Sequence, residues 1–158
     1  MDISDLPPDL AFARLPGTAE ARDWAFEVKR AAMGPHIAAR WGWDEAFQRD
    51  LHARRFAEKP FHAVLLGGRR LGTVSWMALP DGALRLGEFY LPPEAQGRGL
   101  GTRALRHLLA LADARGAPVR LEHLRWNPVG RLYARHGFVA VGGTDVHVLM
   151  ERPVGAGW

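Results

Sequence analysis

The sequence predicts an α+β domain in which a mixed, mostly antiparallel sheet is flanked by helices. Residues 61–91 contain short apolar segments separated by hairpin-type turn residues, a pattern typical of strands. Before and after this region, apolar residues recur three and four positions apart, which is the period of an amphipathic helix. A glycine-rich turn at residues 96–101 connects the last of these strands to one such helical run.

Length and composition are those of a globular protein. We expect the 158 residues to form a single domain, 1–158, with an ordered core of about 10–151 and a loose tail at 152–158. The formal charge of +4 is a mild positive surplus that suits an anionic ligand. The chain has no long basic run, so we expect no nucleic-acid binding. Cysteine is absent, which excludes disulfides, thiolate zinc sites and a cysteine-linked acyl-enzyme.

Membrane, secretion and metal signals are also lacking. No apolar run approaches the ~20 residues of a membrane-spanning helix, so we expect no membrane association. Residues 1–5 are acidic and do not begin a signal peptide, so we expect a cytoplasmic protein. The 7 histidines show no tight ligand spacing, so we expect no metal.

The N-terminal part predicts one strand and two helices. The strand is expected at Leu10–Leu15. Thr18 is a favourable N-cap for the first helix, and Gly34-Pro35 is expected to end it, because proline disrupts a helix interior. The second helix is expected at about Glu45–Phe56.

The segment Trp41-Gly42-Trp43-Asp44-Glu45 lies between these helices. Its two tryptophans and two carboxylates are able to form the wall of a pocket for a cationic amine. The alternative is structural, since aspartate is among the best N-cap residues and tryptophans pack in cores.

Three further strands are expected at Phe61–Leu66, Leu71–Ala78 and Leu84–Leu91. The connections between them, at residues 67–70 and 80–82, carry glycine, proline and aspartate, which favour hairpin turns. These strands are therefore predicted to form an antiparallel meander.

The next turn reads Gln96-Gly97-Arg98-Gly99-Leu100-Gly101 and leads into a helical run at residues 102–115. Glycines let the backbone approach a ligand, and the first N–H groups of a helix have no partner within it. With the positive end of the helix dipole, such amides bind anions, usually phosphate. We interpret this segment as a pyrophosphate site, the alternative being a plain glycine loop with exposed arginines.

Two other phosphate motifs fit less well. The P-loop needs a Gly-Lys pair, which the chain lacks. The dinucleotide fingerprint is matched in part by Gly99-x-Gly101-x-x-Ala104, with Glu122 near the expected distance. However, residues 92–95 separate the turn from its strand, and too few residues follow Glu122 for the further βα units of that fold.

The C-terminal part predicts a strand, a short helix and a terminal hairpin, at Pro118–Leu124, from Pro128 to Gly137, and at Val139–Gly142 with Asp145–Glu151. Asn127 is the expected N-cap of the short helix, with proline at its first position and glycine at its end.

Two of these motifs resemble those of the GNAT superfamily of acyl-CoA N-acyltransferases. The turn at residues 96–101 matches the Q/R-x-x-G-x-G/A signature, and residues 127–138 resemble the late N-P-x-x-R-L-Y-x-R-x-G-F pattern. The order of the elements agrees, and the resemblance spans about Trp24 to Glu151. The Trp41–Glu45 segment and Thr144-Asp145-Val146-His147 look like those of a bacterial subgroup with little functional definition.

This resemblance implies a GNAT fold, with six to seven strands, about four helices and two central strands that splay apart to admit acetyl-CoA as co-substrate. The splayed strands would be Leu84–Leu91 and Val119–Leu124. The first strand would hold the pantetheine arm and the thioester carbonyl, and the turn would hold the pyrophosphate. The implied cofactor-binding residues are Phe89, Tyr90, Leu91, Gln96, Gly97, Arg98, Gly99, Leu100, Gly101, Thr102, Asn127 and Tyr133.

The resemblance also implies direct attack of a neutral amine on the thioester. A lysine-like amine has a pKa near 10.4 and must lose a proton, and the leaving thiolate gains from a nearby donor. Tyr133 falls at the family's general-acid position, although an aromatic on this helix face also suits a core. Glu88, Glu122 and His147 are candidate bases, and a structural ion pair or surface role explains each equally well.

The acceptor is expected to be a small-molecule or peptide amine, and many relatives pair as homodimers. The candidate acceptor-binding residues, partly acidic and aromatic, are Trp41, Trp43, Asp44 and His147. The sequence therefore predicts an acetyl-CoA-dependent N-acetyltransferase. A non-catalytic acyl-CoA sensor or interaction module on the same fold is the alternative, followed by a nicotinamide-dependent oxidoreductase.

Overall fold

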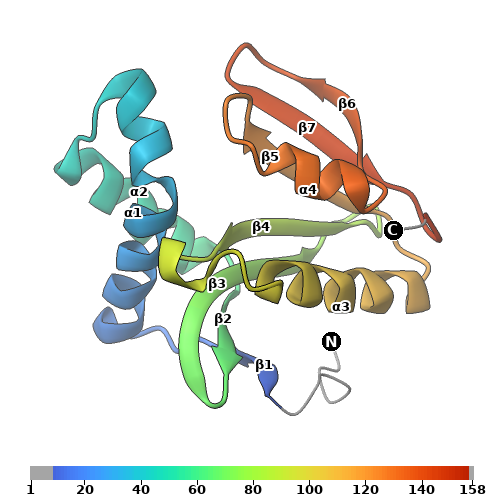
Figure 1. Ribbon diagram of the computed structural model, residues 1–158, viewed down its shortest axis with the longest axis horizontal. Coiled ribbons are helices and arrows are strands. Elements are labelled where there is room, and N and C mark those ends of the chain that lie inside the picture. Colours follow the sequence, from blue (N-terminus) through green and yellow to red (C-terminus); the bar gives the residue numbers. More distant parts are fainter. Residues whose placement is uncertain (1–8, 157–158) are drawn as a thin grey trace.

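The computed structural model describes residues 9–156, which form a seven-stranded mixed sheet with helices on both faces (Figure 1). The elements are β1 (Leu10–Arg14), α1 (Ala19–Trp41), α2 (Glu45–Glu58), β2 (Phe61–Leu66), β3 (Arg69–Ala78), β4 (Leu84–Tyr90), the 3₁₀ turn η1 (Pro93–Ala95), α3 (Leu100–Ala114), β5 (Val119–Leu124), α4 (Gly130–Arg135), β6 (Val139–Gly143) and β7 (His147–Arg152). The strand order is β1-β2-β3-β4-β5-β7-β6, and only β4 and β5 are parallel neighbours. The predicted α+β class is confirmed, with its meander and terminal hairpin.

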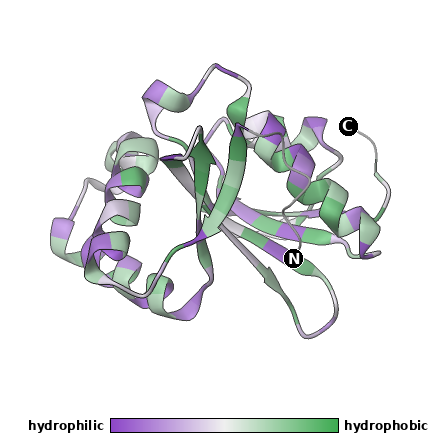
Figure 2. Cartoon of the chain, turned by 90° about the horizontal axis from the view of Figure 1, so that it is seen from below, coloured by the Kyte–Doolittle hydropathy of each residue, from purple (hydrophilic) through white to green (hydrophobic). Residues whose placement is uncertain are grey.

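The core lies between the sheet and its helices. Figure 2 shows α1 and α2 on one side of the sheet and α3 and α4 on the other, with apolar residues concentrated on the strands. On α3, Leu105, Leu108 and Leu109 are each 0% exposed and belong to one core cluster with strand residues such as Val119. Each buried leucine stabilises the fold by about 1.5–3 kcal/mol, so this face fixes the position of the turn that precedes α3.

The two central strands separate after a short contact. Leu84 pairs with Val119 and Arg85 with Arg120, and these are the only β4–β5 pairs among the described residues. Beyond them, β5 continues its pairing with β7 on its other side. The predicted splay is therefore confirmed, and the gap widens toward the C-terminal ends of β4 and β5.

A β-bulge directs the end of β4. Thr73 pairs with Tyr90 and Ser75 with Gly87, so β4 accommodates one extra residue opposite β3. Within this bulge, Glu88 has φ of 48°, in the left-handed region that is uncommon for residues other than glycine. The Thr73 hydroxyl donates to the Glu88 carbonyl at 2.8 Å, which satisfies that group where the regular ladder is interrupted.

The predicted end of the first helix is wrong. α1 does not stop at Gly34-Pro35 but continues to Trp41. An interior proline removes a helix hydrogen bond and costs about 3 kcal/mol. Here contacts beyond the proline compensate, because the Trp126 indole N–H donates to the His36 carbonyl at 2.8 Å and the Trp126 and Trp41 rings meet edge to face.

The short C-terminal helix also begins later than predicted. Asn127 does not cap α4 directly, and Pro128 precedes the helix, which starts at Gly130. The Asn127 side chain instead accepts a hydrogen bond from the Val129 N–H at 3.1 Å, in a turn that leads into α4.

The tail expected to be loose is held as far as Ala156. The Arg152 guanidinium donates to the Ala156 carbonyl and to Asp113, and the Gly155 N–H donates to Asp113 Oδ1 at 2.9 Å. These bonds fasten the residues after β7 to the end of α3. The predictions for residues 1–5 and 157–158 concern residues outside the described range.

Candidate active site

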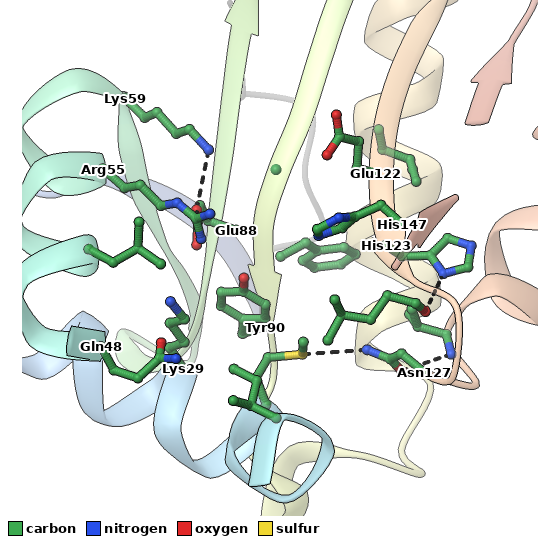
Figure 3. Close-up of a pocket in the computed structure, with 18 of the residues that line it drawn as sticks. Lys29, Gln48, Arg55, Lys59, Glu88, Tyr90, Glu122, His123, Asn127 and His147 are labelled. Atoms are coloured by element: carbon green, nitrogen blue, oxygen red, sulfur yellow. Dashed lines mark hydrogen bonds and ion pairs between the residues drawn. The ribbon is translucent and has the colours of Figure 1, made fainter. Parts of the chain in front are cut away.

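A cavity of about 640 Å³ lies in the gap between β4 and β5 (Figure 3). Its walls come from α1 and α2 on one side, from β4, and from β5, α4 and β7 on the other. The predicted site residues that line it are Trp41, Asp44, Glu88, Phe89, Tyr90, Glu122, Asn127, Tyr133 and His147. Leu91 and residues 96–102 are not in this lining; they follow the end of β4, at the open end of the gap.

The glycine-rich turn presents backbone amides at the start of α3. The Arg103 N–H donates to the Gly99 carbonyl at 3.0 Å, so the amides that precede it in the first turn have no partner within the helix. Gly97 and Gly99 are exposed, with φ of 74° and 73°, a conformation that favours glycine. The Gln96 amide Nε2 donates to the Leu91 carbonyl at 2.8 Å, which ties the turn to the end of β4.

These features fit the diphosphate of a nucleotide-linked thioester. Exposed amides at a helix start and the positive end of the helix dipole together bind phosphate. Arg98 is exposed in the same turn, whereas the Arg103 guanidinium is paired with Asp9 at 2.9 Å. The turn therefore suits the diphosphate of acetyl-CoA, and the adjacent gap suits its extended arm.

Tyr133 and Asn127 lie on the α4 side of the cavity. Tyr133 is buried, its ring meets Phe138 edge to face, and burial raises its pKa above the usual value. Its hydroxyl forms no hydrogen bond with any of residues 9–156. Asn127 Nδ2 donates to the Met33 sulfur at 3.4 Å, a weak acceptor that a ligand carbonyl would readily replace.

Glu88 occupies the opposite wall, where three cations surround it (Figure 3). Lys59 Nζ donates to Glu88 Oε1 at 3.3 Å, and Arg55 Nη1 lies 3.6 Å from the same oxygen. Burial alone would raise the pKa of Glu88, but the positive charges of Lys59, Arg55 and Lys29 outweigh it and lower that pKa. Burial and the charge of Glu88 together raise the pKa of the neighbouring Tyr90 phenol.

Glu122 and two histidines form the β5–β7 wall (Figure 3). Glu122 Oε1 lies 3.6 Å from Arg85 Nη2 in an ion pair that is 37% exposed on both sides. His147 lies on β7 and His123 on β5. His123 Nδ1 lies 2.9 Å from the Leu124 carbonyl oxygen and donates to it.

The predicted acceptor wall is assembled only in part. Trp41 lines the cavity and is 55% exposed. Trp43 does not line it: its indole donates to Glu45 at 2.9 Å and its ring packs between α1 and α2, so the structural interpretation applies. Asp44 lines the cavity and also caps α2, accepting from the backbone N–H three residues later at 3.1 Å.

Sequence reasoning missed five titratable residues of the cavity lining: Lys29, Arg55, Lys59, Arg85 and His123. One signal was available for Lys29, which follows Ala25 by four positions and therefore shares the buried face of α1. Arg55, in the last turn of α2, and Lys59, the residue that follows this helix, are also four apart, but arginine and lysine at that spacing usually mark a solvated face.

Neither a metal-ligand cluster nor a membrane-spanning helix is found among residues 9–156. In that range no group of three or more histidines, aspartates or glutamates is placed to hold a metal ion. None of its helices combines the length and apolar character needed to cross a membrane.

The chain belongs to the GNAT acetyltransferase family, because the sequence model of that family matches residues 20–138. A search of curated proteins gives no significant match.

Solved structures share the fold. The PaiA N-acetyltransferase from Thermoplasma acidophilum, in complex with coenzyme A, gives a TM-score of 0.72 at 17% identity, over 91% of this chain and 98% of that one. An acetyltransferase from Thermus thermophilus gives 0.69 at 21% identity, over 92% and 97% of the two chains. The ribosomal-protein-S18-alanine N-acetyltransferase from Escherichia coli gives 0.65 at 18% identity, over 92% and 94%.

Proposed function

We propose that this protein is an N-acetyltransferase that moves an acetyl group from acetyl-CoA to a primary amine. The main observation behind the proposal is that β4 and β5 separate beside the exposed backbone amides at residues 97–102, where the glycine-rich turn leads into α3. The gap opens into a cavity that contains a buried tyrosine on one side and carboxylates on two walls. Family membership supports acetyl transfer as the reaction.

The reaction needs a neutral amine next to the thioester. The nitrogen lone pair attacks the thioester carbon, a C–N bond forms, the C–S bond breaks, and coenzyme A leaves as a thiolate. One proton leaves the nitrogen and one reaches the sulfur. The protein must therefore supply a proton acceptor on the amine side and a donor on the sulfur side.

We assign the donor to Tyr133. Because burial raises its pKa, the phenol remains protonated at neutral pH. Tyr133 lines the cavity, and its hydroxyl has no hydrogen-bond partner among residues 9–156, which supports a role as donor to the sulfur. A hydrogen bond that strengthens as negative charge develops on sulfur lowers the barrier even before the proton is fully transferred.

We assign the proton acceptor to Glu122, acting directly or through a water molecule. An efficient base has a pKa near the working pH, and the cations around Glu88 move its pKa in the opposite direction. In the described part of the chain Glu122 has one ionic partner, Arg85 at 3.6 Å. It lies on the facing strand near His147, which is the second candidate. Glu88 then remains ionised and holds the cationic wall in place.

Release of free thiol from acetyl-CoA, measured across a panel of primary amines, tests the proposal. We expect amine-dependent thiol release above the rate without amine, and an acetylated product of the matching mass. If acetyl-CoA raises the melting temperature but no amine is acetylated, the protein is an acyl-CoA sensor instead. If acetyl-CoA has no effect on melting, both functions are rejected.

A further inference from the structure

The α1–α2 wall of the cavity carries more positive than negative charge. Lys29 from α1, Arg55 from α2 and Lys59, the residue directly after α2, face a single buried carboxylate, Glu88 (Figure 3). The Glu88 side chain is 3% exposed, and both of its ion pairs use the same oxygen, Oε1. Oε2 has no hydrogen-bond partner among the described residues. One carboxylate thus serves three cations, and none of them is fully neutralised.

The other acids of the cavity do not supply the missing charge. Asp44 caps the first turn of α2, 11 residues before Arg55, which is roughly 16 Å along the helix. Glu122 lies on the facing strand and is already paired with Arg85 at 3.6 Å. The excess of positive charge therefore remains local to the α1–α2 wall.

These cations also have unused hydrogen-bond donors. The Arg55 guanidinium has five N–H donors, yet within residues 9–156 its one ionic contact is Glu88 at 3.6 Å, beyond hydrogen-bond distance. Lys59 has three donors and makes one bond. Lys29 is 3% exposed, and its ammonium forms neither a hydrogen bond nor an ion pair at contact distance with any of residues 9–156. Two acceptors on this side of the cavity, Glu88 Oε2 and Gln48 Oε1, also lack a hydrogen-bond partner among the described residues, but they are fewer than these donors. The surplus of donors indicates a ligand that provides acceptors.

A purely structural role explains this wall poorly. A buried carboxylate needs one cation for neutrality, and each further cation beside it repels its neighbours. The side chains of Arg55 and Lys59 are 38% and 25% exposed, so the full desolvation cost falls on the third cation, which is buried. Lys29 illustrates the cost, since burial lowers its pKa to about 8 despite the attraction of Glu88. The sequence had suggested an acidic, aromatic wall for a cationic acceptor, whereas the structure places a cationic wall beside the reactive strand.

We propose that Lys29, Arg55 and Lys59 bind an anionic oxygen group of the acceptor, so that the preferred substrate is a primary amine that also carries a carboxylate or a phosphate. This inference rests on the proposed function and specifies the substrate class of the same site. Glu88 directly precedes Phe89–Leu91, the segment expected to hold the thioester, so the anionic group binds close to the reacting nitrogen.

A matched set of amines tests the proposal with the full-length protein and acetyl-CoA. Each primary amine is supplied with a carboxylate, a phosphonate or an uncharged carboxamide at the same position, and kcat/KM is measured by thiol release. We expect at least tenfold higher kcat/KM for one of the anionic forms than for the carboxamide. The anionic form with the higher kcat/KM shows whether the site prefers a carboxylate or a phosphate. Equal or better use of the carboxamide overturns the proposal.

The variants Arg55→Met and Lys29→Met test whether these two side chains cause the preference for an anionic amine. Each is expected to lower kcat/KM for the anionic amine at least tenfold and to leave the carboxamide within about twofold. Arg54→Met is the matched control, because Arg54 is adjacent on α2 but has a 60% exposed side chain paired with Asp50 outside the cavity. An unchanged anion preference in both cavity variants contradicts the assignment, and equal loss with both forms of the amine indicates a merely structural role.

A binding measurement separates this inference from the proposed function. If no amine is acetylated, the same amines are titrated calorimetrically against the protein saturated with coenzyme A. Tighter binding of the anionic form, lost in Arg55→Met and kept in Arg54→Met, supports the anion site although catalysis has failed. Equal binding of anionic and uncharged forms rejects it.

Discussion

Replacing Lys29 by methionine should make the protein more stable. Lys29 is 3% exposed on the buried face of α1, where burial is the main cause of a pKa lowered from 10.5 to about 8. Glu88 attracts the ammonium, while Arg55 and Lys59 repel it. Methionine has a similar length and no charge, so it fills the same space without the desolvation cost.

The size of the effect follows from the two pKa values. A difference between 10.5 and about 8 corresponds, at 1.36 kcal/mol for each pH unit, to about 3 kcal/mol of destabilisation while Lys29 is charged in the folded protein. We therefore expect Lys29→Met to raise the free energy of unfolding at pH 7 by about 2–3 kcal/mol. For a chain of this size the melting temperature should rise by about 5–10 °C.

The stability gain of the variant should depend on pH. The pKa of Lys29 is lower in the folded protein than in the unfolded chain. The destabilisation caused by the buried charge is therefore complete below pH 8. It disappears as pH rises from about 8 to 10.5, because in that range only the unfolded chain keeps the proton. Denaturant titrations of both proteins at pH 7 and pH 10 should show the advantage of the variant shrinking toward zero. A variant less stable than the wild type at pH 7, or an advantage independent of pH, would refute the reasoning.

Three further substitutions test the site and the gap. Tyr133→Phe should lower kcat about 100-fold while leaving the calorimetric affinity for coenzyme A nearly unchanged; an unchanged kcat removes the hydroxyl from the mechanism. Glu122→Gln should lower kcat more than Glu88→Gln at saturating amine, and the reverse order would assign proton removal to β4. Gly72→Ala should destabilise the fold by about 2–3 kcal/mol in a thermal melt, because its Cβ would lie 2.3 Å from a backbone oxygen of β4. Gly142→Ala is the control, because a Cβ at Gly142 would meet no described atom within 4 Å. Equal stability of the two alanine variants would contradict the close approach of β3 and β4.

The strands, the turn and most helix boundaries were predictable because they depend on local patterns. Alternation and hairpin residues defined the meander, and the glycines at 97 and 99 marked the start of α3. The extension of α1 past Pro35 was not predictable, because it depends on the Trp126 side chain, which is 90 residues away from His36 in the sequence. A local rule for proline cannot include such a contact.

The candidate site also contains residues that were predictable from local sequence and residues that were not. Tyr133 and Asn127 were identified from a motif, and the structure places both at the cavity. The cationic wall was missed, since the sequence shows Arg55 and Lys59 as ordinary helix-surface residues. Only the packing of α2 across the end of β4 brings them to Glu88, and that packing is decided by contacts about 30 residues apart.

Calorimetric titration of acetyl-CoA into the protein tests the central claim most directly, because both the catalytic proposal and the acceptor proposal require the turn and the gap to bind it. Acetyl-pantetheine, which lacks the diphosphate together with the adenosine and its 3′-phosphate, is the comparison. We predict saturable binding of acetyl-CoA with one site per chain and at least tenfold weaker binding of acetyl-pantetheine. No heat of binding at millimolar acetyl-CoA, or equal affinity for both compounds, would contradict the account.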